Sequence, residues 1–135
     1  MSRPGYSAGQ GLRPQSIVIP ILAGAALTAF ANGKTYANIL IPQSGKIIGV
    51  NFNVGGKGGT FSTGTVAVKN GANTVCTLNA ASAVAGTPTQ VEGSSLSNTD
   101  LVKDGTLTLV SAESGGTSPT WQDVTIQIDY IPTGD

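Results

Sequence analysis

The sequence predicts an all-β protein, an antiparallel β-sandwich or jelly roll of about eight short strands with an extended N-terminal arm. Three observations predict this class. Apolar residues recur at every second position in several short runs, which buries one face of a strand and leaves the other in water. Turn-forming residues separate these runs roughly every eight to twelve positions. Only 10% of the residues are charged, whereas helical bundles need the Glu, Lys and Arg that are scarce here.

The chain of 135 residues is expected to form a single domain. Residues 1–16 contain two prolines, three glycines and two arginines without any periodicity, which is typical of an irregular segment. We therefore assign residues 1–16 to an extended N-terminal arm and residues 17–135 to the β-sandwich domain. Arg3, Tyr6 and Arg13 are the arm side chains that we expect to contact a neighbouring subunit or an underlying shell.

Residues 17–31 allow two interpretations. Basic residues precede this mostly apolar run, and Ala29-Phe30-Ala31 resembles a cleavage site, so one interpretation is a secretory signal peptide. Pro20 interrupts the run, which favours an edge strand bent at this proline and a second short strand over residues 27–30. The run is too short to cross a bilayer as a helix, so no membrane partner is expected.

The clearest strands are expected in the central stretch, residues 46–78. The first of them carries alternating apolar residues, which are Ile48, Val50, Phe52 and Val54. The glycine-rich sequence GGKGGT at residues 55–60 follows, and we predict that it is a flexible loop between strands. A second alternating strand then leads to Asn70-Gly71, a dipeptide that tolerates the positive φ of a tight hairpin turn.

Further strands are expected on either side of this centre. Residues 35–41 precede it, and residues 89–91 and 106–110 follow it. Between the last two, Leu96, Leu101 and Val102 are expected to pack onto the core from a turn, with one helical turn over residues 98–103 at most. The final strand presents one apolar face, made of Val124, Ile126, Ile128 and Tyr130.

Basic and acidic residues are distributed unevenly along the chain. Residues 1–70 contain six basic side chains and no acidic one, whereas residues 71–135 contain one basic and seven acidic side chains. Such asymmetry suits orientation on a charged partner or pairing of neighbouring copies, unless interleaved strands mix the charges in space. The basic residues are spread singly and aromatic residues are few, so no nucleic acid partner is expected.

The chain has one cysteine, Cys76, and no histidine. An intramolecular disulfide is therefore excluded, which suits folding in a reducing cytoplasm. The position of Cys76 in an alternating run predicts a small buried side chain in place of a reactive thiol. The missing histidine removes the usual nucleophile pairs and the usual general base, so we expect no enzyme, no catalytic residue and no cofactor.

Two groups of residues resemble ligand sites in part. The glycines around Lys57 resemble a phosphate-binding loop, but Gly58 stands where Ser or Thr is required and no helix pattern follows. Asp100 and Asp104 lack the flanking ligands of a calcium loop. Asp123 and Asp129 of the last strand would lie about 20 Å apart along that strand. No metal is therefore expected.

Trp121 and Tyr130 are the aromatic residues that would form a glycan-binding platform if both were exposed. A tryptophan at the start of a core strand more commonly fills the core. We therefore predict that Trp121 is a core residue, and the glycan platform remains the alternative.

The succession of these segments resembles the β-sandwich virion proteins of tailed bacteriophages, particularly capsid decoration (cement) proteins and related head-fibre or tail modules. The resemblance lies in the Gly/Pro-rich arm, the alternating KIIGVNFNV, the hairpin TVAVKNGANTV, the small-residue tract before DGTLTLV and the closing strand DVTIQIDYIP. It covers residues 33–132 as a pattern of strands and contains no invariant motif.

The resemblance implies a viral structural protein on the outer surface of a capsid, folded in the host cytoplasm, that cements neighbouring capsid subunits and stabilises the head. The resemblance also implies that the partner is the major capsid protein and that the chain forms a homotrimer, and it implies no catalytic residue. Arg3, Tyr6 and Arg13 would then lie on the shell. The alternatives are a head-fibre or tail module, and a secreted glycan-binding adhesin domain, which predicts an exposed aromatic patch and cleavage after Ala31.

Overall fold

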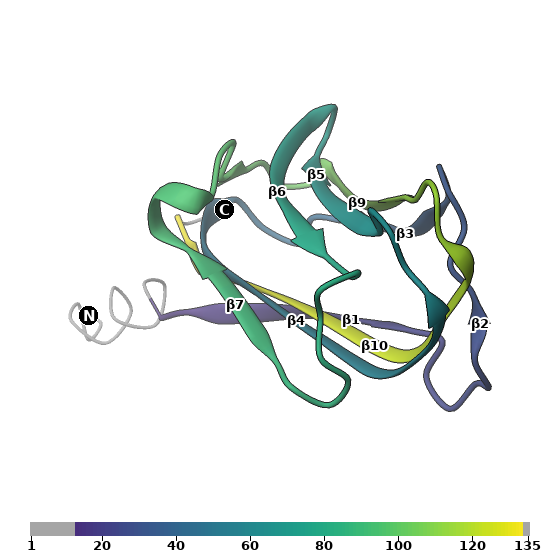
Figure 1. The fold of residues 1–135 in the computed structure, drawn as a ribbon. Coiled ribbons are helices and arrows are strands. Elements are labelled where there is room, and N and C mark those ends of the chain that lie inside the picture. Colours follow the sequence, from purple (N-terminus) through teal and green to yellow (C-terminus); the bar gives the residue numbers. More distant parts are fainter. Residues whose placement is uncertain (1–12, 134–135) are drawn as a thin grey trace, which may run out of the picture.

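The computed structural model describes residues 13–133, which form two antiparallel β-sheets stacked on one another (Figure 1). The larger sheet contains β1 (Gln15–Ile21), β2 (Thr28–Ala29), β4 (Gly45–Thr60), β7 (Thr89–Glu92), β8 (Asp100–Leu101) and β10 (Thr117–Pro132). The smaller sheet contains β3 (Thr35–Leu40), β5 (Thr65–Asn70), β6 (Asn73–Asn79) and β9 (Thr106–Ala112). The predicted all-β sandwich or jelly roll is confirmed, and the described chain adds only one 3-10 turn, η1 (Gly93–Ser95).

Strand order follows from the pairing. The larger sheet runs β1-β10-β4-β7, with β2 also pairing with β10 and β8 with β4. The smaller sheet runs β3-β9-β5-β6. Strands β4 and β10 are each 16 residues long and form the centre of the larger sheet. Figure 1 shows both strands curving at one end toward the smaller sheet, so that the larger sheet wraps around one side of the core.

The predicted alternation of β4 is broken at Ile48. Ile48 is 39% exposed, whereas its neighbour Ile47 is buried. Asp129 of β10 lies opposite Gly49 and Tyr130 lies opposite Ile47, so Ile48 is the extra residue of a β-bulge. The remaining predicted core residues of this strand, Val50, Phe52 and Val54, are buried.

The prediction of a flexible loop at residues 55–60 is wrong. These residues continue β4 and pair with β10. Glycine is required here because the chains approach closely: a Cβ atom at Gly55 would lie 2.6 Å from that of Asp123. Gly59 has φ +67°, and a Cβ atom there would collide with the backbone carbonyl of Ser118. The glycines therefore serve close packing inside a strand.

Strand β1 is an edge strand, as predicted. It pairs with β10 along its whole length, from Gln15 opposite Tyr130 to Ile21 opposite Val124. An edge position tolerates Pro20 because one side of the strand has no partner. Because β1 begins at Gln15, the last two residues of the predicted arm belong to this strand.

Residues 17–31 are part of the fold. They supply β1, β2 and the buried side chain of Phe30. Cleavage after Ala31 would remove both strands and this part of the core, so the structure does not support the signal-peptide interpretation. The other short strands predicted before and after the centre are present as β3, β7 and β9.

An aromatic cluster fills the core at the curved end of β4 and β10. Trp121 is fully buried, which confirms its prediction as a core residue. Its ring makes edge contacts with Phe30, at 4.5 Å between ring centroids, and with Tyr36, at 5.1 Å. Phe30 also contacts Phe61 at 5.2 Å. Edge contacts of this kind stabilise a core beyond the area they bury.

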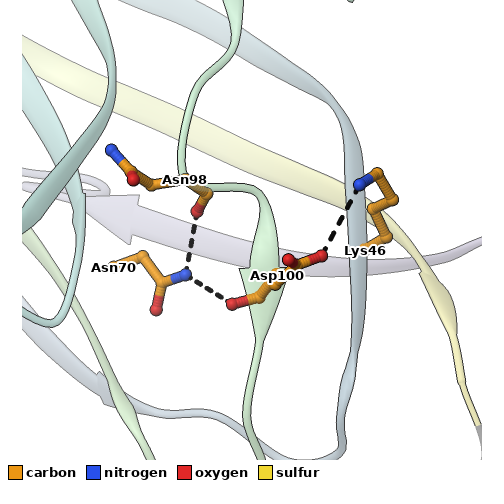
Figure 2. A network of polar contacts seen from close by, with 4 residues as sticks. All are labelled: Lys46, Asn70, Asn98 and Asp100. Carbon is orange, nitrogen blue, oxygen red and sulfur yellow. Dashed lines mark hydrogen bonds and ion pairs between the residues drawn. The ribbon is translucent and has the colours of Figure 1, made fainter.

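A polar network joins the two sheets at the opposite end (Figure 2). Nδ2 of Asn70, at the end of β5, donates to the backbone carbonyls of Asn98 at 2.9 Å and Asp100 at 2.7 Å. The Asp100 carboxylate pairs with Lys46 of β4 at 3.5 Å. One amide side chain thereby ties the smaller sheet to a segment that is paired with the larger one.

Two details of this end differ from prediction. The hairpin turn consists of Gly71 and Ala72, one residue later than expected, with φ +63° at Gly71. The segment expected to hold a helical turn, residues 98–103, contains strand β8 in its place. Leu101 is buried as predicted, but Val102 is 65% exposed.

Candidate functional site

The predicted arm contacts lie at the start of the larger sheet. Arg3 and Tyr6 are outside the described residues 13–133. Arg13 is exposed and stands two residues before β1. Arg13 and Pro14 therefore lead directly into an edge strand, and a partner held by Arg13 would lie beside the end of this sheet.

The outer face of the larger sheet carries amide side chains on neighbouring strands. The register places Gln127 of β10 opposite Asn51 of β4, and Thr125 opposite Asn53. Gln90 of β7 lies on the other side of Asn51. A shallow groove of about 270 Å³ lies on this face. We call it the amide groove, and it is lined by Asn51, Phe52, Asn53, Pro88, Thr125 and Gln127.

Asp129 fixes two of these amide groups. Its Oδ2 accepts a hydrogen bond from Nδ2 of Asn51 at 2.9 Å, and its Oδ1 accepts one from Nε2 of Gln127 at 2.9 Å. Ser16 of β1 donates to the same carboxylate at 2.6 Å. An ionised carboxylate only accepts hydrogen bonds, so the amide nitrogens must face Asp129. The amide oxygens of Asn51 and Gln127 are thereby left for other partners.

The acidic residues do not gather into a metal site. Within residues 13–133, no three His, Cys, Asp or Glu side chains lie close enough together to hold an ion. Two of the carboxylates considered for a metal site have structural partners instead. Asp123 accepts a hydrogen bond from the backbone nitrogen of Gly24 at 2.7 Å, and Asp100 pairs with Lys46.

Lys57 of the glycine-rich sequence also makes structural contacts. Its Nζ donates to the backbone carbonyls of Ala81 and Ala83, both at 2.9 Å, and lies 4.7 Å from the centre of the Phe61 ring. Burial lowers the pKa of Lys57. This side chain holds the loop after β6 against β4, so it does not form part of a phosphate cradle.

The aromatic residues considered for a glycan platform are both buried. Trp121 has no exposed surface, and Tyr130 is 2% exposed. The Tyr130 hydroxyl donates to Oε1 of Gln43 at 3.2 Å, and burial raises the pKa of Tyr130. Neither ring can stack on a sugar, so this pair does not provide the exposed aromatic patch that the adhesin alternative predicts.

Exposed apolar side chains are present where the termini of the described chain lie. Leu40 and Val102 are 64% and 65% exposed. Backbone hydrogen bonds bring their segments together, since Ile41 donates to the carbonyl of Gly105 and Asp104 donates to that of Ile41. These segments flank the start of β4, which pairs with the end of β10, so Leu40, Val102 and the start of β1 share one end of the molecule.

The alternation along β4 and β10 places the amide residues on the solvent face of their strands and does not show that they meet. Their assembly into a groove depends on the pairing of β4 with β10, which places Gln127 opposite Asn51, 76 positions away in the chain. The one signal in the sequence is the choice of residue type: Asn51 and Asn53 are asparagines, a residue type that is depleted in strands.

Within residues 13–133, no helix is both long and apolar enough to span a membrane. No family model and no curated protein matches this chain. A comparison with solved structures found the structure of the infectious bursal disease virus Gx strain, at 20% identity and a TM-score of 0.36. The match covers 91% of this chain and 33% of that chain, so this chain spans about a third of that protein's length. At a TM-score of 0.36 the two structures differ too much for the likeness to bear on function.

Proposed function

We propose that this chain is a virion structural protein that binds the outer surface of a bacteriophage capsid and joins neighbouring capsid subunits. Its partner is the major capsid protein, and the protein acts as a homotrimer after folding in the host cytoplasm. The resemblance of its strand pattern to capsid decoration proteins supports this proposal. The architecture is consistent with it, since the described residues form a sandwich with a filled core.

One observation carries the proposal: the N-terminal segment continues directly into β1, which pairs with β10 over seven consecutive residues. A pull on the segment along the strand axis loads all of the hydrogen bonds between β1 and β10 at once, in shear. A segment attached to a loop would instead transmit the same pull to a few bonds in succession. This connection suits an anchor that must hold the sandwich on a shell under internal pressure.

The end of the sandwich from which this segment emerges also offers apolar contact area. Leu40 and Val102, two exposed apolar side chains, lie at that end. In this proposal Arg3, Tyr6 and Arg13 hold the arm on the shell while Leu40 and Val102 rest against it. Two weak contacts joined by a short connection bind far more tightly than either alone.

The experiment is a co-sedimentation assay with phage particles that lack this protein. We expect the full-length chain to bind in stoichiometric copies, and a chain lacking residues 1–12 to lose binding while keeping its melting temperature. The triple variant Arg3→Ala, Tyr6→Ala, Arg13→Ala should behave like the truncation. Lys69→Ala, on the outer face of the smaller sheet, is the matched control for loss of a positive charge. Normal occupancy by the truncated chain would overturn the arm's role.

A further inference from the structure

β1 and β2 lie one after the other along the same edge of β10. Ile21, the last residue of β1, pairs with Val124. Thr28, the first residue of β2, pairs with Trp121. Six residues, 22–27, therefore connect two points that only two residues of β10 separate. The chain makes an excursion between β1 and β2, and we call residues 22–27 the linker loop.

The linker loop is long enough for β1 to move away from its own β10. Its two ends are attached three residue steps apart on β10, which corresponds to about 10 Å. Seven steps of extended chain lead from Ile21 to Thr28, and they span up to about 23 Å. β1 can therefore leave β10 while β2 and the rest of the larger sheet keep their pairing.

The linker loop holds one residue in an unfavourable backbone conformation. Leu22 has φ +57°, in the left-handed region that glycine, asparagine and aspartate tolerate far better than leucine. Its carbonyl accepts hydrogen bonds from the backbone nitrogens of Ala25 and Asp123, which keep the loop in this shape. Most of the loop and Asp123 are exposed, so water can replace these bonds when the loop straightens. Straightening also removes the strain at Leu22.

β1 is stable only beside a β10 strand. Ile19 and Ile21 are buried, and Ile17 packs partly against the core. A detached β1 would expose these side chains to water and leave one edge of β10 unpaired. Within residues 13–133, β1 pairs with no strand other than β10. The place that fits β1 away from its own chain is therefore the same place on a second copy.

We propose that copies of this chain exchange β1: the β1 of one copy pairs with the β10 of the next, and the straightened linker loop joins the two copies. All seven residue pairs of β1 and β10 are kept, because both strands are the same in every copy. Each exchange also releases the strain at Leu22. Exchange of an identical element is a low-cost route to an oligomer.

Exchange that closes on itself forms a ring, and a ring of three is the homotrimer of the proposed function. The arm of each copy would then be anchored on its neighbour, so a pull on the arm would load a contact between subunits. The exchange itself concerns contacts between copies in solution and does not rest on attachment to a capsid.

The first experiment identifies which β10 holds β1. Val18 and Gln127 are paired, and Cα atoms of paired residues lie about 4.5–5.5 Å apart, a distance that a disulfide bridges. The double variant Val18→Cys, Gln127→Cys is refolded at about 1 mM with reductant, because exchange requires β1 to detach, and the oligomer is isolated by gel filtration and oxidised. The native Cys76 is buried and does not compete.

The two arrangements give different products on a denaturing gel without reductant. In a closed chain the disulfide forms within one chain, which then runs as a monomer. In an exchanged ring each disulfide joins one chain to the next, so we expect a covalent trimer. An oligomer that yields only single chains on this gel would overturn the proposal, as would a wild-type chain that stays monomeric after refolding at about 1 mM.

A mixture of two single variants controls for chance contacts between surfaces. Val18→Cys is made in the full-length chain and Gln127→Cys in the chain lacking residues 1–12, so that the gel separates the products by length. Refolding the two together should give a disulfide-linked dimer of one long and one short chain. Mixing them after separate refolding should not, because each β1 is already in place. Equal yields from both mixtures would mean random collision and contradict exchange.

Variants of the linker loop test the source of the exchange. Leu22→Gly removes the strain of the closed form and should lower the oligomer-to-monomer ratio by about tenfold for each loop. Loss of the partial contact of Leu22 with the core acts in the opposite direction, since it weakens the closed form. Ala25→Gly is the matched control, because Ala25 lies in the same loop without a positive φ.

Deletion of residues 23–26 removes the surplus length, so that β1 and β2 run on as one edge strand. This variant should remain monomeric at about 1 mM. Oligomer formation at the wild-type level by both Leu22→Gly and the deletion variant would contradict the proposal. The assays contain no phage particle, so their failure is separate from that of capsid binding.

Discussion

At the scale of single residues, Cys76 shows how the core controls chemistry. Its side chain is buried, as its place in an alternating run predicts, and burial raises the pKa of the thiol from 9.0 to about 11. The thiol is therefore protonated at neutral pH. We expect no reaction of native Cys76 with a thiol reagent at pH 8 until the protein is unfolded, which a comparison with and without denaturant would test. Fast modification of the native chain would contradict this.

The same pKa shift predicts how stability depends on alkaline pH. Between pH 9 and about pH 11 the thiol of the unfolded chain has lost its proton while the folded chain retains it. The unfolded state then binds fewer protons, so the free energy of unfolding falls as pH rises through this window. Cys76→Val should remove this contribution. Denaturation curves of the two proteins should keep a constant separation below pH 9 and converge or cross above it.

Asn70 gives a second prediction at the residue scale. Its Nδ2 donates to two backbone carbonyls and ties the smaller sheet to β8. Asn70→Ala should lower the free energy of unfolding by about 1–2 kcal/mol, measured by chemical denaturation. Asn73→Ala is the control, because Asn73 is exposed in the same hairpin. Equal effects of the two substitutions would mean that the amide bonds add nothing to stability.

At the scale of elements, β4 shows what the sequence could and could not predict. Val50, Phe52 and Val54 follow a period of two, and burial of that face alone locates the strand. The same reasoning did not place Gly55 and Gly59 in the strand. Glycine is required there because a neighbouring strand approaches closely, and the sequence of β4 alone does not show that approach. The bulge at Ile48 was hidden for a similar reason, since it is a property of the pairing with β10.

The glycine-rich part of β4 yields a prediction. Gly59→Ala should destabilise the fold by about 3 kcal/mol or more, because it combines positive φ with a collision against the backbone of Ser118. Gly24 also has positive φ, but a Cβ atom there meets nothing within 4 Å. Gly24→Ala should therefore cost only about 1–2 kcal/mol. Thermal unfolding of both variants tests the comparison, and equal losses would show that the backbone of Ser118 yields to the new side chain.

At the scale of the whole molecule, the first and last strands hold the larger sheet together. Ile19 and Ile21 of β1 are buried against β10, which is also the partner of β2 and β4. Removal of residues 1–21 should therefore expose the inner edge of β10 and abolish cooperative unfolding. Removal of residues 1–12 should leave the melting temperature unchanged. Circular dichroism melts of the two truncated chains provide the test, and a cooperative melt of the shorter chain would contradict it.

The sequence predicted single residues of the candidate site but not how they come together in the folded molecule. Arg13 could be singled out because charge and chain position are visible in the sequence. Asn51, Asn53 and Gln127 could be assigned only to solvent-facing positions, since their groove exists through pairing of strands distant in the chain. Burial patterns constrain each strand separately, whereas the order of strands in a sheet depends on the whole chain. For this reason, a surface site to which several strands contribute is not predicted by the pattern of any one strand.

The pairing of Gln15 with Tyr130 brings the beginning and the end of the sandwich to the same corner, so the backbone is almost a closed loop. A short Gly/Ser linker could join the two ends, and the chain could be reopened elsewhere without breaking a sheet. The loop at Gly24 offers such a place, at the far end of β1. For a domain that carries fused cargo, this choice decides where the cargo emerges. A fusion after Thr133 emerges on the side of Arg13, whereas a permuted chain releases its cargo at the opposite end.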